Sequence, residues 1–302
     1  MPARRQRKVT SPRLKAYLEA KKHDTLLLGA VDRYIQMLPD DRDATVIHPS
    51  EMSKKNWCPR ATWHRLMGHP VIKEKAPPPL RLSMIFDTGT ESGKKWQRWT
   101  RDMGILWGRW VCLVCYENCF AWSDELPVTK CPGRVPMPGR LTSDMHLWEY
   151  KEVPLVSGRI GGHADGIVNP TGDESLVMEN KTIGPGTLRL LGILGEDEHD
   201  EAASDKFGRI TAVLPSHFMQ TQIYLRLAQD LAETLGPINR AVIIYEHKMD
   251  QKVREFVVRY DPRWTDDLWD IALDIEWQIG RGREVKCPYG GCAECWAYEE
   301  GD

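Results

Sequence analysis

The pattern of apolar and polar residues divides the chain into predicted helices and strands. Helical spacing predicts helices over residues 15–38, 88–104, 215–235 and 266–282. From residue 147 onward, strands are predicted in LWEYKEVPLV, GRIGGHADGIV and SLVMENKTI, and RAVIIYEHK followed by VREFVVRYD predicts a hairpin. Pro170-Thr171-Gly172-Asp173 is a strong turn signal between GRIGGHADGIV and SLVMENKTI. These two strands should therefore pair as an antiparallel hairpin.

Three segments show neither the helical nor the strand pattern of apolar residues. Residues 107–140 are dense in Pro and Gly and contain cysteines, so we expect a small knuckle held by metal rather than by an apolar core. Residues 183–210 are glycine-rich and acidic in their middle, so we expect a mobile lid or loop. The three prolines of KEKAPPPLRL predict an exposed connection.

Length and charge leave several classes of protein open. The 302 residues suit one large domain or two smaller ones, and a net charge of −2 neither demands nor excludes a nucleic-acid partner. The first segment, MPARRQRKVTSPRLKAYLEAKK, is strongly basic. It is either a contact for phosphates or, more simply, a flexible solubilising arm.

The cysteine content indicates metal. No apolar run has the length of a membrane span and no signal-peptide pattern opens the chain, so we expect a cytoplasmic protein without membrane contact. Disulfides are disfavoured in that compartment, and eight clustered cysteines then favour metal binding.

The strongest chemical signal lies at the end of an apolar strand. Glu179 and Lys181 are two residues apart in SLVMENKTI and so share one face of the strand. If the hairpin turn centres on Gly172, Asp165 lies opposite Glu179. Two carboxylates facing each other repel, and a bound Mg²⁺ or Mn²⁺ would remove the repulsion. This pattern predicts metal-assisted phosphodiester hydrolysis, although each residue alone would be read as a capping residue or a surface ion pair.

Three motifs follow one another along the chain: Gly162-x-x-Asp165, Glu179-x-Lys181 and Gln220-x-x-x-Tyr224. Their order carries a resemblance to a known family, which covers residues 58–295 approximately. The chain resembles the RecB-type branch of the PD-(D/E)XK nucleases, and within it the CRISPR-associated "Cas-four" exonucleases and their phage-encoded relatives. The resemblance implies an α/β fold with a mixed central sheet flanked by helices.

The resemblance also implies a role for each motif residue. Asp165, Glu179 and the carbonyl of Asn180 would hold Mg²⁺ or Mn²⁺, and Lys181 would orient or activate the water. The residues that would support the site and the DNA are Gln220 and Tyr224.

The helix before this core departs from the family pattern. Relatives often carry a metal-binding His there, whereas this chain has Gly89-Thr90-Glu91-Ser92-Gly93. Glu91 or Gln97 could take its place, and we assign Glu91 as a metal ligand. A glutamate on a helix is, however, more commonly a solvent-exposed side chain than a metal ligand.

The domain division follows from the resemblance. Residues 1–50 would form a basic arm and helix, and residues 51–302 a RecB-like nuclease domain. Residues 107–140 would be a zinc-ribbon-like insertion within that domain.

One cysteine set joins distant parts of the sequence. Cys58, within NWCPRATW, is similar to the lone upstream cysteine of the family's iron–sulfur exonucleases. With Cys287, Cys292 and Cys295, the resemblance implies a [4Fe–4S] cluster that staples the N- and C-terminal parts together. Structural zinc would use the same four thiolates.

A second cysteine set lies in the insertion. Cys112, Cys115, Cys119 and Cys131 resemble a degenerate zinc ribbon. Either Cys119 is the fourth ligand, or His146 replaces it, or the segment holds no metal. The neighbouring tryptophans would either stack on DNA bases or form the small core of the knuckle. These tryptophans are Trp107, Trp110 and Trp122.

The sequence therefore predicts a Mg²⁺- or Mn²⁺-dependent deoxyribonuclease, an exonuclease of single-stranded DNA ends in phage or bacterial recombination, repair, replication or spacer acquisition. An endonuclease with the same site and a non-catalytic DNA-binding module are the alternatives. A helicase or recombinase partner and an oligomeric ring, as in relatives, are compatible with the sequence, and no feature in it argues for either.

Overall fold

A computed structural model of the chain describes residues 27–38, 42–72, 78–129, 131 and 145–298. The basic segment that opens the sequence lies outside these residues, as does most of the second half of the predicted insertion. The described residues fall into two units, residues 27–38 with 78–85 and residues 42–72 with 86–298. The second unit contains every strand that the structure describes and every candidate site residue.

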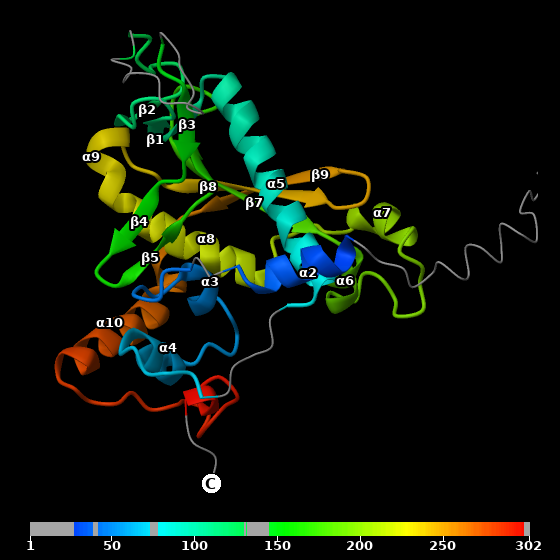
Figure 1. Ribbon diagram of the computed structural model, residues 1–302, viewed down its shortest axis with the longest axis vertical. Coiled ribbons are helices and arrows are strands. Elements are labelled where there is room, and N and C mark those ends of the chain that lie inside the picture. Colours follow the sequence, from blue (N-terminus) through cyan, green and yellow to red (C-terminus); the bar gives the residue numbers. More distant parts are fainter. Residues whose placement is uncertain (1–26, 39–41, 73–77, 130, 132–144, 299–302) are drawn as a thin grey trace, which may run out of the picture. The chain divides into compact units, whose positions relative to one another are not determined.

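The helices and strands follow one another as in Figure 1. The α-helices are α2 (Leu28–Gln36), α3 (Pro49–Met52), α4 (Pro59–Leu66), α5 (Leu80–Asp102), α6 (Pro185–Leu190), α7 (Ala202–Phe207), α8 (Pro215–Ala228), α9 (Ala232–Leu235) and α10 (Asp266–Gly280). The strands are β1 (Leu106–Cys112), β2 (Asn118–Trp122), β3 (Trp148–Lys151), β4 (Pro154–Ser157), β5 (Ile160–His163), β6 (Gly166–Val168), β7 (Leu176–Ile183), β8 (Arg240–His247) and β9 (Val253–Arg259). Three short 3-10 helices complete the list: η1 (Gln229–Leu231), η2 (Pro262–Trp264) and η3 (Trp296–Tyr298).

A mixed sheet forms the centre of the second unit. Its strand order is β2-β1-β6-β7-β8-β9, and β3 also pairs with β1. The β7–β8 pair is parallel, and the other strand pairs described in this sheet are antiparallel. Strands β4 and β5 form a separate two-stranded sheet. The α/β class with a central mixed sheet and flanking helices is therefore confirmed.

The two faces of the sheet carry two apolar cores. Alternate residues of β8, Ala241, Ile243 and Tyr245, belong to the core on the α8 face, whereas Val242 and Ile244 belong to the core on the α5 face, where Trp96 packs. Because β8 is buried on both faces, its sequence is a nearly continuous apolar run rather than an alternating one.

The hairpin predicted around Gly172 is present. In β6 and β7, Gly166 pairs with Met178 and Val168 with Leu176, so the turn is centred on Gly172. Gly172 adopts a φ of +83°, which favours glycine, and its N–H donates to the Asn169 side chain over 2.8 Å. The prediction of one continuous strand over GRIGGHADGIV is wrong, because β5 pairs with β4 in the small sheet and only β6 enters the central one.

The prediction of a mobile lid or loop over residues 183–210 is wrong in one respect, because the segment is not a loop throughout. This segment contains α6 and α7, and Leu188, Leu194 and Phe207 are at most 2% exposed. Lys206 forms an ion pair with Glu198 on the surface of the segment. Two helices of six residues each are too short to display a helical period, which explains why the sequence pattern missed them.

Part of the predicted knuckle at residues 107–140 is built into the central sheet. Its strands β1 and β2 belong to the central sheet, and Trp107 and Trp110 are buried in the cores on the two faces, with exposed fractions of 5% and 0%. The interpretation of these two tryptophans as stacking platforms for DNA is therefore wrong. Among the helices that the structure describes, none is both long enough and apolar enough to span a membrane.

Candidate active site and metal centres

Asp165 and Glu179 come together at the open end of the β6–β7 hairpin. Continuing the register by one residue from Gly166 and Met178 places Asp165 opposite Glu179, as the sequence predicts. The backbone N–H of Asn180 donates to Oδ2 of Asp165 over 2.6 Å. Lys181 Nζ donates to Oε1 of Glu179 over 2.5 Å. We call Asp165, Glu179 and Lys181 the carboxylate site.

The charges of the carboxylate site interact strongly because the protein excludes most water from it. Burial, followed by the negative charge of Glu179, raises the pKa of Asp165 well above its usual value. Burial alone would lower the pKa of Lys181, but Glu179 and Asp165 outweigh that effect and raise it. Lys181 is therefore a cation at neutral pH. Asp165 remains partly accessible, so a ligand can reach it.

The buried carboxylate of Glu179 leaves one oxygen available. Glu179 is 2% exposed, and its Oε2 has no hydrogen-bond partner among the described residues. An unpaired carboxylate oxygen inside a protein is costly unless a cation binds it. Carboxylate and carbonyl oxygens suit Mg²⁺ and Mn²⁺, so the donors present at the carboxylate site fit such an ion.

Helix α8 supplies the two residues of the third motif. Gln220 and Tyr224 are both buried, and they share a hydrogen bond. Burial, followed by the charge of Glu179, raises the pKa of Tyr224 well above its usual value, so the phenol stays protonated near the carboxylate site. A Cβ at Gly162 would lie 3.2 Å from the Tyr224 hydroxyl, which explains the glycine of the first motif.

His217, one turn before Gln220, lies close to the same charges. Its Nδ1 is 2.8 Å from the hydroxyl of Tyr245, which pairs with Lys181 in the β7–β8 ladder. Burial, followed by the positive charge of Lys181, lowers the pKa of His217 to about 4. His217 is therefore neutral at physiological pH.

Among the described residues, no hydrogen bond or ion pair joins Glu91 to the carboxylate site. Its side chain is 69% exposed and pairs with Lys94 over 2.8 Å, so the structure gives its assignment as a metal ligand no support. The residue of α5 that reaches the site is Gln97, whose Nε2 donates to the carbonyl of Asp165 over 2.9 Å and to Glu152 over 3.0 Å. Gln97 is one of the two residues that the sequence offers in place of the metal-binding His of relatives.

Glu152 is a site residue that sequence reasoning missed. It follows β3, shares the amide of Gln97 with Asp165, and contributes to the raised pKa of Asp165. The residue sits in a surface-like run of alternating charges, WEYKEV, and only the folding of β3 beside β1 brings it near Asp165. No local sequence signal marks it.

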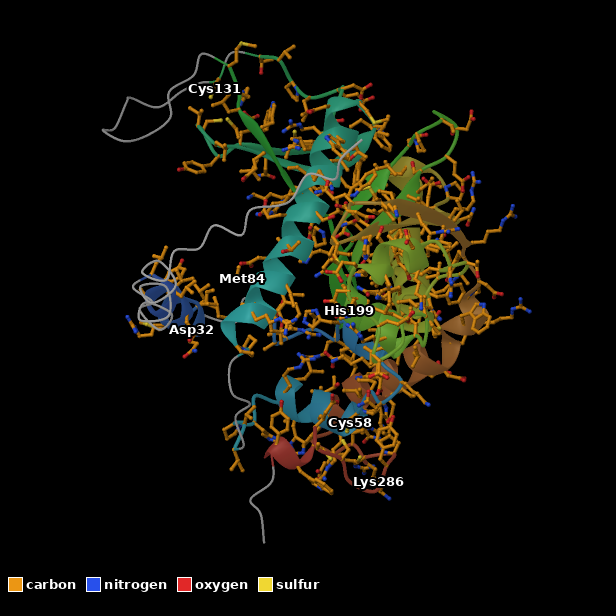
Figure 2. The ribbon with its side chains drawn as sticks, turned by 90° about the vertical axis from the view of Figure 1, so that its right-hand side faces the viewer. Asp32, Cys58, Met84, Cys131, His199 and Lys286 are labelled. Atoms are coloured by element: carbon orange, nitrogen blue, oxygen red, sulfur yellow. The ribbon has the colours of Figure 1, made fainter. Side chains whose placement is uncertain are left out.

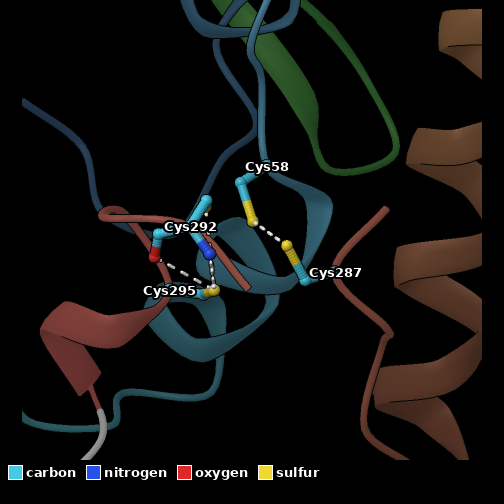
Figure 3. Close-up of side chains that lie close together, drawn as sticks. All are labelled: Cys58, Cys287, Cys292 and Cys295. Atoms are coloured by element: carbon cyan, nitrogen blue, oxygen red, sulfur yellow. Dashed lines mark hydrogen bonds between the residues drawn. The ribbon is translucent and has the colours of Figure 1, made fainter. Parts of the chain in front are cut away.

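The C-terminal cysteine centre contains the four residues that the resemblance groups together. The sulfur atoms of Cys58, Cys287, Cys292 and Cys295 all lie within 4.8 Å of one another (Figure 3). The Sγ atoms of Cys58 and Cys287 are 3.8 Å apart, and those of Cys292 and Cys295 are 3.7 Å apart. None of the eight cysteines forms a disulfide. These four could hold a metal ion.

The sulfur separations in the C-terminal cysteine centre can be compared with those expected around a single zinc ion and around a [4Fe–4S] cluster. Four thiolates about 2.3 Å from one zinc ion lie about 3.8 Å apart, which matches the Cys58–Cys287 and Cys292–Cys295 separations. Four thiolates around a [4Fe–4S] cluster lie farther apart, because an iron atom stands between each sulfur and the centre. The donor set suits both groups, and the present spacing matches the single ion.

The β1 cysteine centre consists of Cys112, Cys115, Cys131 and His146. Their ligand atoms also lie within 4.8 Å of one another, and Cys115 Sγ is 3.5 Å from His146 Nδ1. The fourth member is His146, the alternative open in the sequence, and not Cys119, which lies on β2 opposite Trp110. Two groups that could hold a metal ion therefore lie among the described residues of the second unit, and Figure 2 shows Cys58 and Cys131 at opposite ends of it.

Comparison with known proteins adds little. No protein-family model matches the chain, and no curated protein matches it. Among solved structures, "Crystal structure of SSO0001" aligns over 87% of this chain and 86% of that chain, with 14% sequence identity and a TM-score of 0.34. A likeness of that size supports no statement about fold or function.

Proposed function

We propose that the protein is a Mg²⁺- or Mn²⁺-dependent DNA exonuclease that hydrolyses phosphodiester bonds at single-stranded ends. The observation that carries the proposal is the carboxylate site. Two carboxylates that repel each other face across one hairpin end, a lysine cation bonds to one of them, and a buried carboxylate oxygen has no partner among the described residues. Such a site is unfavourable without a cation and suited to one.

The residues of the site would have distinct tasks. Asp165 and Glu179, with the carbonyl of Asn180, would hold the metal ion, which supplies charge stabilisation at the phosphate and lowers the pKa of a bound water. Lys181 has a raised pKa and carries a full charge, so it would orient the water or stabilise the phosphate rather than accept a proton. Gln220 and Tyr224 would support this arrangement from α8.

The cysteine centres would stabilise the fold rather than take part in hydrolysis. Zinc at the β1 cysteine centre would secure the end of β1, where Cys112 lies. At the C-terminal cysteine centre, family resemblance supports a [4Fe–4S] cluster, and the sulfur spacing supports one zinc ion. Metal analysis and visible absorption of anaerobically purified protein decide between them: iron with a charge-transfer band assigns the cluster, and zinc in a colourless protein assigns the ion.

The DNA substrate and the exonucleolytic mode of cutting are taken from the family resemblance, and members of that family act in phage or bacterial recombination, repair or replication. The test compares end-labelled linear and closed circular single-stranded DNA, each with Mn²⁺ or with EDTA. Mn²⁺-dependent loss of the linear strand alone is the expected result. Cutting of the circle would make the enzyme an endonuclease. Binding without cutting of either strand would overturn the proposal in favour of a DNA-binding module.

A further inference from the structure

A buried polar network lies on the face of β7 and β8 opposite the carboxylate site. At its centre is Glu246, near the end of β8, which is 5% exposed. Its carboxylate accepts hydrogen bonds from Lys95 Nζ over 2.5 Å, Ser92 Oγ over 2.9 Å and Trp96 Nε1 over 3.0 Å. All three donors come from α5, so this buried charge is paired by one helix.

The network extends from α5 to the strand that carries the site. The side chain of Asn180 on β7 donates through Nδ2 to Ser92 Oγ over 3.0 Å. Helix α5 approaches β7 closely at this point, since a Cβ at Gly89 would lie 3.3 Å from Oγ1 of Thr182. Ser92 and Asn180 are both buried, with exposed fractions of 7% and 8%. The contact therefore lies inside the protein, where an unpaired polar group is costly.

The direction of each hydrogen bond in the network is determined. Burial alone would raise the pKa of Glu246, but the hydrogen bonds from Lys95, Trp96 and Ser92 outweigh it and hold the pKa below its usual value. Glu246 is therefore ionised and only accepts. Ser92 gives its single hydroxyl proton to Glu246, so its oxygen must accept from Asn180. The side-chain amide of Asn180 is thus held with Nδ2 toward α5.

Asn180 connects this network to the carboxylate site through its backbone. Its N–H donates to Asp165, and its neighbours Glu179 and Lys181 project to the opposite face of β7. Gln97 of the same helix donates to the carbonyl of Asp165. Helix α5 thereby holds both Asp165 and Asn180.

We propose that the Ser92–Glu246 pair is a positioning device that sets metal affinity at the carboxylate site by fixing Asn180 in β7. The inference rests on the proposed metal binding by Asp165 and Glu179, and it does not depend on DNA hydrolysis. Hydrogen-bond partners of this kind, which orient the groups around a metal, commonly change its affinity about 10- to 100-fold when removed.

The experiment measures Mn²⁺ binding to DNA-free protein by electron paramagnetic resonance, with Glu179→Gln defining the signal of the site. Ser92→Ala breaks the link between Asn180 and Glu246, and Glu246→Gln keeps the shape of the side chain while removing its charge. Ser83→Ala is the matched control: Ser83 is a buried serine of the same helix whose hydroxyl has no partner among the described residues. Where DNA is cut, turnover at saturating Mn²⁺ is recorded as well.

The expected result is a Mn²⁺ affinity about 10-fold weaker in Ser92→Ala and in Glu246→Gln, unchanged in Ser83→Ala, with saturated turnover changed by no more than about twofold. A Ser92→Ala protein that binds Mn²⁺ as tightly as Ser83→Ala overturns the inference. A Ser92→Ala or Glu246→Gln protein that loses turnover at saturating Mn²⁺ while its Mn²⁺ affinity is unchanged also overturns the inference. If Ser92→Ala fails to fold, Glu246→Gln decides alone. A wild type that binds Mn²⁺ but cuts no DNA counts against the nuclease proposal only.

Discussion

The backbone amide of Asn180 donates a hydrogen bond to the carboxylate of Asp165 over 2.6 Å, across the end of the β6–β7 hairpin. This bond orients one carboxylate while the neighbouring residue, Glu179, brings in the second. Without a cation, burial and the charge of Glu179 raise the pKa of Asp165 well above its usual value, so the site disfavours a second negative charge. Several consequences of that repulsion can be measured.

Replacing Asp165 by Asn should stabilise the metal-free protein at neutral pH, by an amount on the order of 1 kcal/mol, because it removes a carboxyl group whose charged form is repelled by the facing Glu179. The pKa of Asp165 is raised in the folded state, so between its unfolded value of about 4 and its folded value the native protein binds more protons than the unfolded chain. The stability of the wild type relative to Asp165→Asn should therefore fall as pH rises through that window.

Urea unfolding in EDTA at several pH values measures this difference. Added Mn²⁺ should raise the stability of the wild type and not that of Asp165→Asn, because only the wild type keeps both carboxylates. A stability difference that is independent of both pH and Mn²⁺ would contradict the interpretation of the site.

The two cysteine centres predict the metal content of four proteins. Cys58→Ser should lose the metal of the C-terminal cysteine centre, and His146→Ala that of the β1 cysteine centre. Cys119→Ser is the matched control and should keep both metals, because Cys119 lies outside either group. Elemental analysis after desalting checks this. Loss of metal from Cys119→Ser, with retention in His146→Ala, would restore the original four-cysteine assignment.

Helix α5 offers a direct comparison between two of its polar residues. Gln97→Ala should raise the Mn²⁺ concentration for half-maximal activity about 10-fold, because Gln97 donates to the Asp165 carbonyl. Glu91→Gln should leave it unchanged, since Glu91 is exposed and paired with Lys94. Metal titrations of the two variants measure the effect. The reverse order of effects would mean that Glu91 binds the metal after all.

The segment between β7 and α8 should behave as part of the core. Phe207→Ala removes a side chain that is 1% exposed and should lower the free energy of unfolding by about 3–5 kcal/mol. Leu190→Ala, a control in the same segment with 91% exposure, should change it by less than about 0.5 kcal/mol. Denaturant unfolding compares them, and equal small effects would indicate a loosely held loop.

Local patterns predicted the parts of the site that depend on a single hairpin. The turn signal at Gly172 and the count of residues on either side placed Asp165 opposite Glu179, because an antiparallel register is set by its turn. The same reasoning put Glu179 and Lys181 on one face. Both predictions needed only the alternation of side chains along a strand.

Contacts between distant segments could not be predicted in this way. Gln97 and Glu152 meet Asp165 only because α5 crosses the sheet and β3 pairs with β1. In the sequence, Glu246 has the pattern of a solvent-exposed charge at a strand end. Its burial against Ser92 depends on the packing of α5. His146 replaces Cys119 because pairing with β1 carries Cys119 into the sheet.

The central claim is that the carboxylate site hydrolyses DNA with the help of a metal ion. The most direct test is the Mn²⁺-dependent degradation of end-labelled single-stranded DNA by the wild type, by Lys181→Ala and by Lys94→Ala, whose lysine is exposed and pairs with Glu91. The account predicts activity in the wild type and Lys94→Ala that EDTA abolishes, and a loss of about 100-fold or more in Lys181→Ala. Undiminished degradation by Lys181→Ala, or a metal-loaded wild type that binds DNA without cutting it, would contradict it.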